Sequence, residues 1–249
     1  MVRVSKGKNA KYVPAKQSNT MTYVLGGIAV LVVIVVVIGG VLLISKKEGT
    51  PADQAQASID KATPAFVLGK ADAPTKLTFF EDPYCPACGN LERQYGEQLT
   101  KAVEDGKLQI KFFLVSFLNR QSPSGDYSDR AAGGLLAIAK SSLPEEQKQK
   151  AWMGAHTAMY ANQPAEGQGD KTNAEIATTL GDGAKAKGVE LPADVTAAIS
   201  EGKYTVESAQ NAGAASQLMQ DLNATGTPTV VNNGEKLTLS GDWLTPLLQ

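Results

Sequence analysis

An uninterrupted apolar run from Met21 to Ser45 constrains this chain more than any other feature of its sequence. The run carries no charge and consists mostly of Val, Ile, Leu and Gly. A helix needs about 20 such residues to cross the hydrocarbon core of a membrane, whereas the apolar part of a cleaved signal peptide is shorter, about 7–15 residues. A buried helix of a soluble protein normally keeps a polar face. We therefore predict that residues 21–45 form one uncleaved transmembrane helix, a signal anchor.

Basic residues are more numerous before this run than after it. Those before it are Arg3, Lys6, Lys8, Lys11 and Lys16. Only Lys46 and Lys47 follow it directly. By the positive-inside rule, residues 1–20 are a cytoplasmic tail and the chain beyond Lys47 lies outside the cell membrane. A basic tail can also bind nucleic acid, but beside a membrane span the topological interpretation is favoured, and we expect no nucleic-acid partner.

The remaining chain, roughly 200 residues, is long enough for one sizeable domain. Residues 46–63 are small and polar, and Ile59 is their one large apolar side chain. We interpret them as a flexible linker between the membrane and a domain over residues 64–249. The net charge of −1 indicates no strongly acidic or basic partner.

The first part of this domain has the pattern of a strand–helix–strand unit. A short apolar strand is predicted over residues 76–80, and a nearly continuous apolar strand over residues 108–118. Between them a helix runs from Cys85 to about Gly106, with apolar side chains every four residues. These side chains are Leu91, Tyr95, Leu99 and Val103. The unit is therefore a βαβ motif.

The second part changes in composition. Residues 126–204 are rich in Ala, Glu, Lys and Gln, which predicts a block of three or four helices. A further helix over residues 206–224 precedes two short strands, which Asn233-Gly234 joins in a hairpin. The last eight residues are interpreted as a short closing helix. The order of elements favours an α/β fold into which a helical block is inserted.

The only two cysteines, Cys85 and Cys88, lie at the start of the first helix. A zinc site needs four ligands, usually Cys or His, and the one histidine, His156, is expected to be an ordinary packed or surface residue of its helix. No metal site is expected. A disulfide across two residues closes too short a loop to stabilise a fold. A redox pair fits best, because a helix N-terminus stabilises a thiolate at Cys85.

Residues 79–92, FFEDPYCPACGNLE, and residues 224–241, ATGTPTVVNNGEKLTLSG, carry a family resemblance. Together they resemble the DsbA-like thiol–disulfide oxidoreductases, which are thioredoxin folds with a helical insertion. The membrane-anchored arrangement is similar to that of actinobacterial members. The resemblance covers most of residues 63–249. It implies that Cys85 is the exposed attacking cysteine, that Cys88 is the buried resolving one, and that Thr227-Pro228 is a cis-proline loop facing them and binding substrate.

Residues around the cysteines depart from the family pattern at two positions. Ala87 stands where the family often has His, so strong oxidising power does not follow from the resemblance. Phe79 stands where many relatives carry an acid. Glu81 and Asp82 are nearby acids, and we expect them to be solvated loop residues rather than a proton relay. Pro86 stiffens the turn at the helix start.

These features predict an extracytoplasmic disulfide oxidase that uses its Cys85–Cys88 disulfide and no other cofactor. Its expected substrates are exported cysteine-containing proteins, and the resemblance implies a quinone-linked membrane protein as the partner that reoxidises it. Two alternatives stay open. The same fold could serve a disulfide reductase or isomerase, and the proline loop with the helical block could form a non-catalytic peptide-binding or chaperone module.

Overall fold

A five-stranded mixed sheet organises residues 49–249, the part of the chain that the computed structural model describes. The strands are β1 (Phe66–Leu68), β2 (Thr75–Glu81), β3 (Leu108–Leu114), β4 (Thr229–Asn232) and β5 (Glu235–Lys236). Their order across the sheet is β1-β3-β2-β4-β5. Only β2 and β3 are parallel, and the other neighbours run antiparallel. The parallel pair is joined by helix α3 (Pro86–Glu104), as the predicted βαβ motif requires.

Helices cover both faces of the two central strands, which explains why β2 and β3 are almost wholly buried. Side chains alternate between the faces. Phe79 packs edge-on against Phe112 on one face, and Phe80 stacks on Phe113 on the other. The first pair belongs to the core under α3 and the helical block, and the second to a smaller core under α2 and α8.

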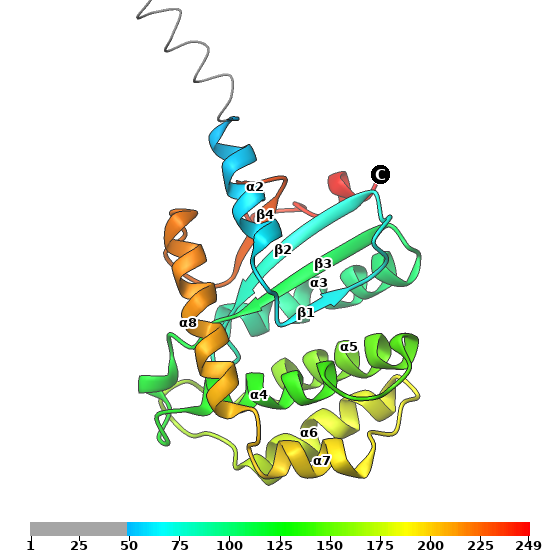
Figure 1. The fold of residues 1–249 in the computed structure, drawn as a ribbon, viewed down its shortest axis with the longest axis vertical. Coiled ribbons are helices and arrows are strands. Elements are labelled where there is room, and N and C mark those ends of the chain that lie inside the picture. Colours follow the sequence, from blue (N-terminus) through cyan, green and yellow to red (C-terminus); the bar gives the residue numbers. More distant parts are fainter. Residues whose placement is uncertain (1–48) are drawn as a thin grey trace, which may run out of the picture. The chain divides into compact units, whose positions relative to one another are not determined.

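The helical block predicted over residues 126–204 is confirmed. It contains α4 (Tyr127–Ala139), α5 (Glu145–Ala161), α6 (Asn173–Ala186) and α7 (Ala193–Ser200). Figure 1 shows these four helices gathered on one side of the sheet. The chain then returns to the sheet through α8 (Thr205–Asp221) and the β4–β5 hairpin. At the predicted hairpin turn, Asn233 and Gly234 both have positive φ angles, 49° and 78°, as a tight turn of this kind demands.

Helix α2 (Pro51–Lys61) corrects the prediction of a flexible linker over residues 46–63. The helix begins with a capping box, because the Thr50 hydroxyl accepts from Asp53 N and the Asp53 carboxylate accepts from Thr50 N. Its Ile59 is fully buried in the same core as Phe80. Small polar residues predict a linker, but here they form a capped helix with one fully buried side chain.

Smaller differences concern short elements. Strand β1 was not predicted, because three residues are too few to show a periodic pattern. The predicted closing helix is only a 3₁₀ turn over Thr245–Leu247. Among residues 49–249 no helix is long and apolar enough to cross a membrane. The predicted span over residues 21–45, and the tail before it, lie outside the described residues.

Candidate active site

Cys85 is the residue immediately before helix α3, just beyond the end of strand β2. Its backbone N–H donates to Asp82 O at 2.9 Å in a tight turn, and Pro86 occupies the first helical position. Cys88 lies one turn further along, and both cysteines are free thiols. The sequence of strand, turn and helix therefore places both cysteines at the start of α3, as predicted.

An open groove of about 840 Å³ reaches Cys85 but is not lined by Cys88. Its walls include Ala87, Phe117, Arg120, Glu166 and Thr227. Cys85 is only 6% exposed, so the expectation of an exposed cysteine is wrong in terms of surface area. The groove nevertheless gives a molecule access to this residue. Cys88 is fully buried, as expected of a resolving cysteine. A molecule in the groove can therefore reach one sulfur and not the other.

The Thr227-Pro228 loop lies directly opposite Cys85. The predicted cis peptide bond between these two residues is confirmed. When protonated, the Cys85 thiol donates to the carbonyl oxygen of Thr227 at 3.4 Å across a sequence separation of 142 residues. The fold thus brings the two motifs of the sequence together at the groove.

The two thiols have opposite electrostatic environments. The thiol of Cys88, as a hydrogen-bond donor, is the largest influence that lowers the pKa of Cys85. Burial acts the other way, but the Thr227 side chain and the N–H groups of Ala87 and Cys88 add to the lowering, and the pKa of Cys85 falls to about 6. Burial first, then Cys85 and Glu81, raises the pKa of Cys88 well above its ordinary value. At neutral pH Cys85 is a thiolate and Cys88 a thiol.

Glu81 and Asp82 are both buried, so the prediction that they are solvated loop acids is wrong. The sequence could not reveal this, because the cover comes from helices α4 and α5 and from the loop after β3, which are distant along the chain. Asp82 accepts hydrogen bonds from Ser128 Oγ at 2.6 Å and Leu118 N at 2.9 Å. Burial raises the pKa of Asp82 above its ordinary value.

Glu81 is the last residue of strand β2 and bonds to His156, for which the sequence predicted no functional role. Its Oε2 lies 2.8 Å from His156 Nε2 and accepts from the Tyr160 hydroxyl at 3.5 Å. His156 is 4% exposed and stacks on Trp152 at 5.0 Å. Burial lowers the pKa of His156, but Glu81 and Glu92 outweigh it, and the pKa is raised. Trp152, His156 and Tyr160 are spaced four residues apart on one face of α5, and this spacing was the sequence signal for a packed histidine.

Two further residues hold the turn that carries Cys85. The Gln163 side-chain amide donates to Pro83 O at 2.9 Å and to Cys85 O at 3.0 Å. The Tyr84 hydroxyl donates to Gly169 O at 2.6 Å and accepts from Gly167 N at 3.0 Å, which fixes the loop that carries Glu166. Neither role was predicted, because loop residues have no periodic pattern.

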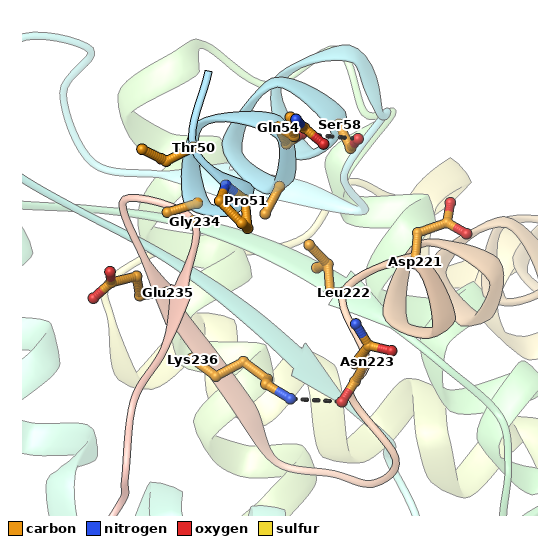
Figure 2. Close-up of a pocket in the computed structure, with 12 residues that line it drawn as sticks. Thr50, Pro51, Gln54, Ser58, Asp221, Leu222, Asn223, Gly234, Glu235 and Lys236 are labelled. Atoms are coloured by element: carbon orange, nitrogen blue, oxygen red, sulfur yellow. Dashed lines mark hydrogen bonds between the residues drawn. The ribbon is translucent and has the colours of Figure 1, made fainter. Parts of the chain in front are cut away.

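A second groove, of about 870 Å³, lies away from the cysteines, between the start of α2, the end of α8 and the β4–β5 hairpin. Figure 2 shows its lining side chains, among them Asp221, Glu235 and Lys236. Lys236 Nζ donates to Asn223 O across it. Within residues 49–249 no cluster of three or more acidic, histidine or cysteine side chains could hold a metal ion.

Known proteins share this fold and the greater part of this domain. The family model described as Thioredoxin matches residues 61–245. The structure is similar to the reduced form of the disulfide bond oxidoreductase DsbG of Mycobacterium tuberculosis, with a TM-score of 0.55 and 27% identity over 74% of this chain and 85% of that one. It is also similar to reduced DsbA of Mycobacterium tuberculosis, with a TM-score of 0.53 and 28% identity over 70% of this chain and 84% of that one.

A curated protein that is similar in sequence is much longer than this chain. Serine/threonine-protein kinase PknE of Mycobacterium tuberculosis is 28% identical over 208 residues, which are 82% of this chain and 34% of that protein. The chain spans about a third of the length of the curated relatives it matches.

Proposed function

The chain belongs to the thioredoxin family, and from this premise we propose that it is a DsbA-like thiol–disulfide oxidoreductase that oxidises cysteine pairs in exported proteins. The observation that carries the proposal is the lowered pKa of Cys85, about 6, in a groove that reaches this sulfur alone. A stabilised thiolate is a good leaving group and an unreactive product, and both properties favour handing the disulfide to a substrate.

The proposed direction of transfer is supported by which redox form the fold stabilises. Three kinds of hydrogen-bond donor stabilise the thiolate of the reduced protein. They are the Cys88 thiol, the Thr227 side chain and the backbone N–H groups at the helix start. Because the disulfide form gains nothing from these donors, reduction of the protein becomes more favourable and the pair becomes a stronger oxidant.

The reaction proceeds in two exchanges. A substrate thiolate attacks Cys85 Sγ, the Cys85–Cys88 bond breaks, and its electron pair passes to Cys88 Sγ, which takes up a proton because its pKa is high. The second substrate thiolate then attacks the substrate sulfur of the mixed disulfide, and Cys85 leaves as a thiolate. Two electrons have moved from the substrate to the protein. Thr227, beside Cys85, offers backbone groups that an extended peptide can pair with.

The proposed location is the outer side of the cell membrane, with the protein held there by the apolar run over residues 21–45. Its substrates would be exported proteins with cysteine pairs, and a membrane redox partner would reoxidise it. No cofactor beyond the Cys85–Cys88 pair is required. Protease added outside intact cells should remove the domain and leave the tail before Met21 protected.

The decisive experiment is a redox equilibrium with glutathione, combined with oxidation of a dithiol peptide by the oxidised protein. We expect a potential more oxidising than about −200 mV, nearer to that of a disulfide donor than to that of a reductase. A potential below about −230 mV would show a reductase instead. Peptide binding that persists without any disulfide transfer would favour the non-catalytic module.

A further inference from the structure

We propose that His156 and Glu92 extend Glu81 into a proton path that joins the buried thiol of Cys88 to the protein surface. The inference rests on the proposed function, because each cycle requires Cys88 to gain and later lose a proton. His156 and Glu92 do not touch the reacting sulfurs, and they act through Glu81 as positioning residues.

The need for a path follows from the burial of Cys88. When the disulfide is reduced, Cys88 Sγ receives the electron pair of the broken bond and one proton. When the disulfide forms again, Cys88 must release that proton before its sulfur can attack. Cys88 is fully buried and does not line the groove at Cys85. The charge of Glu81 is one of the influences that raise the pKa of this thiol, and the path assigns the exchange of the proton to Glu81.

The middle of the path is the imidazole of His156. Its Nε2 lies 2.8 Å from Glu81 Oε2, and its Nδ1 lies 3.6 Å from Glu92 Oε2. Both ring nitrogens therefore face carboxylates, one from β2 and one from α3. An imidazole can take a proton at one nitrogen and release it at the other. The longer distance is that of an ion pair, so transfer to Glu92 requires a small approach of the two side chains.

The remaining neighbours of the ring keep it in place without competing for the proton. Trp152 and Phe112 contact it at ring distances of 5.0 Å and 4.8 Å, and Tyr160 meets it edge-on at 5.0 Å. The Tyr160 hydroxyl bonds to Glu81 Oε2 rather than to the histidine. The titratable groups around His156 are thus Glu81, Glu92 and Tyr160, from β2, α3 and its own helix.

The outer end of the path is Glu92, whose side chain is 10% exposed. Its Oε1 accepts from the hydroxyl of Thr157, an exposed residue of α5, at 2.6 Å. Glu92, His156 and Thr157 are among the residues that line a largely apolar cavity of about 20 Å³, which is large enough for one water molecule.

Gly96 has no side chain, and the Glu92 carboxylate occupies the space that a side chain there would fill. A Cβ at this position would come within 2.7 Å of Glu92 Oε1. Gly96→Ala would therefore push the carboxylate away, while alanine itself favours a helix more than glycine does. Displacement of Glu92 can in this way be separated from loss of stability.

The test is the single-turnover reduction of the Cys85–Cys88 disulfide by dithiothreitol in the full chain, measured in H₂O and D₂O across a range of pH. The variants are His156→Gln, Glu92→Gln and Gly96→Ala, with Glu97→Gln, an exposed acid on the same helix, as the matched control. We expect His156→Gln to slow reduction roughly tenfold, below the full effect of a positioned acid or base. Its solvent isotope effect should rise, because proton transfer becomes limiting.

Glu92→Gln and Gly96→Ala should show smaller changes of the same kind, and Glu97→Gln none. Wild-type rates and isotope effects in Glu92→Gln and Gly96→Ala would overturn the proposal, even if His156→Gln failed to fold. A slower rate with an unchanged isotope effect would also overturn it, since that indicates only a structural role. Dithiothreitol reduces any disulfide it can reach, so this readout is independent of the proposed function. That function fails separately if the wild-type protein does not oxidise a dithiol peptide.

Discussion

At the scale of single residues, the two sulfurs differ in access and in charge although only Pro86 and Ala87 separate them. Cys85 is reached from the groove and is a thiolate at neutral pH, whereas Cys88 is enclosed and protonated. The difference follows from the helix start, because free N–H groups point at the first sulfur and the apolar core surrounds the second.

Replacing each cysteine by serine should therefore give unequal results. Cys85→Ser removes the sulfur that a substrate can reach, and we expect no dithiol oxidation at all. Cys88→Ser keeps the attacking sulfur but removes the one that resolves the adduct, so mixed disulfides should accumulate. Gel electrophoresis without reductant measures both outcomes. Equal trapping by the two variants would mean that the roles are assigned wrongly.

The acidity of Cys85 also depends on Thr227. Thr227→Val removes the side-chain hydrogen bond and keeps the backbone carbonyl, so the pKa of Cys85 should rise from about 6. The absorbance of the thiolate at 240 nm, followed against pH, measures this shift. Thr225→Val, in the same groove, is the matched control and should leave the titration unchanged.

At the scale of elements, helix α2 buries one large apolar side chain in the core of the domain. Ile59 is fully buried against the face of the sheet that carries Phe80. Ile59→Ala should lower the free energy of unfolding by about 2–4 kcal/mol, the cost of a cavity in a packed core. Urea unfolding measures the loss. Val206→Ala, at a 73% exposed position of α8, should change little. An equal effect of both variants would contradict the docking of α2.

Elements with a strong periodic pattern were predictable from the sequence, and those that depend on tertiary cover were not. The stripe Leu91, Leu99 and Val103 marked α3, and Asn233-Gly234 marked the hairpin, because each pattern is local. The burial of Glu81 and its bond to His156 depend on helix α5, which begins 64 positions further along the chain. A sequence shows that an acid follows a strand, but not which distant helix covers it.

At the scale of the whole molecule, the oxidation state couples to stability through Cys85. A pKa lowered from 9.0 to about 6 contributes stability to the reduced form that is fully present above pH 9 and is lost as pH falls through 6. The raised pKa of Cys88 has no effect below pH 9, because that group is protonated in both the folded and the unfolded chain.

The stability of the reduced protein relative to the oxidised protein should therefore decrease between pH 8 and pH 5. Urea unfolding of both forms at the two pH values measures the difference between their stabilities. Groups that titrate alike in the two forms cancel in this difference. Cys85→Ser is the matched control. The difference between its stabilities with and without reductant should be the same at both pH values. A difference that stays constant with pH in the wild type would contradict the low pKa of Cys85.

The enclosure of Cys88 has a consequence for the timing of adducts. Any thiol that bonds to Cys85, whether from a protein or from a small metabolite, stays attached until a second sulfur displaces one partner. Cys88 competes for that step only after it has lost its proton, so the rate of deprotonation sets the adduct's lifetime. If the protein oxidises dithiol substrates as proposed, a substrate whose second cysteine arrives within this interval would leave oxidised, and one whose cysteine arrives later would be released unchanged. The protein would then select substrates by how quickly their cysteines meet.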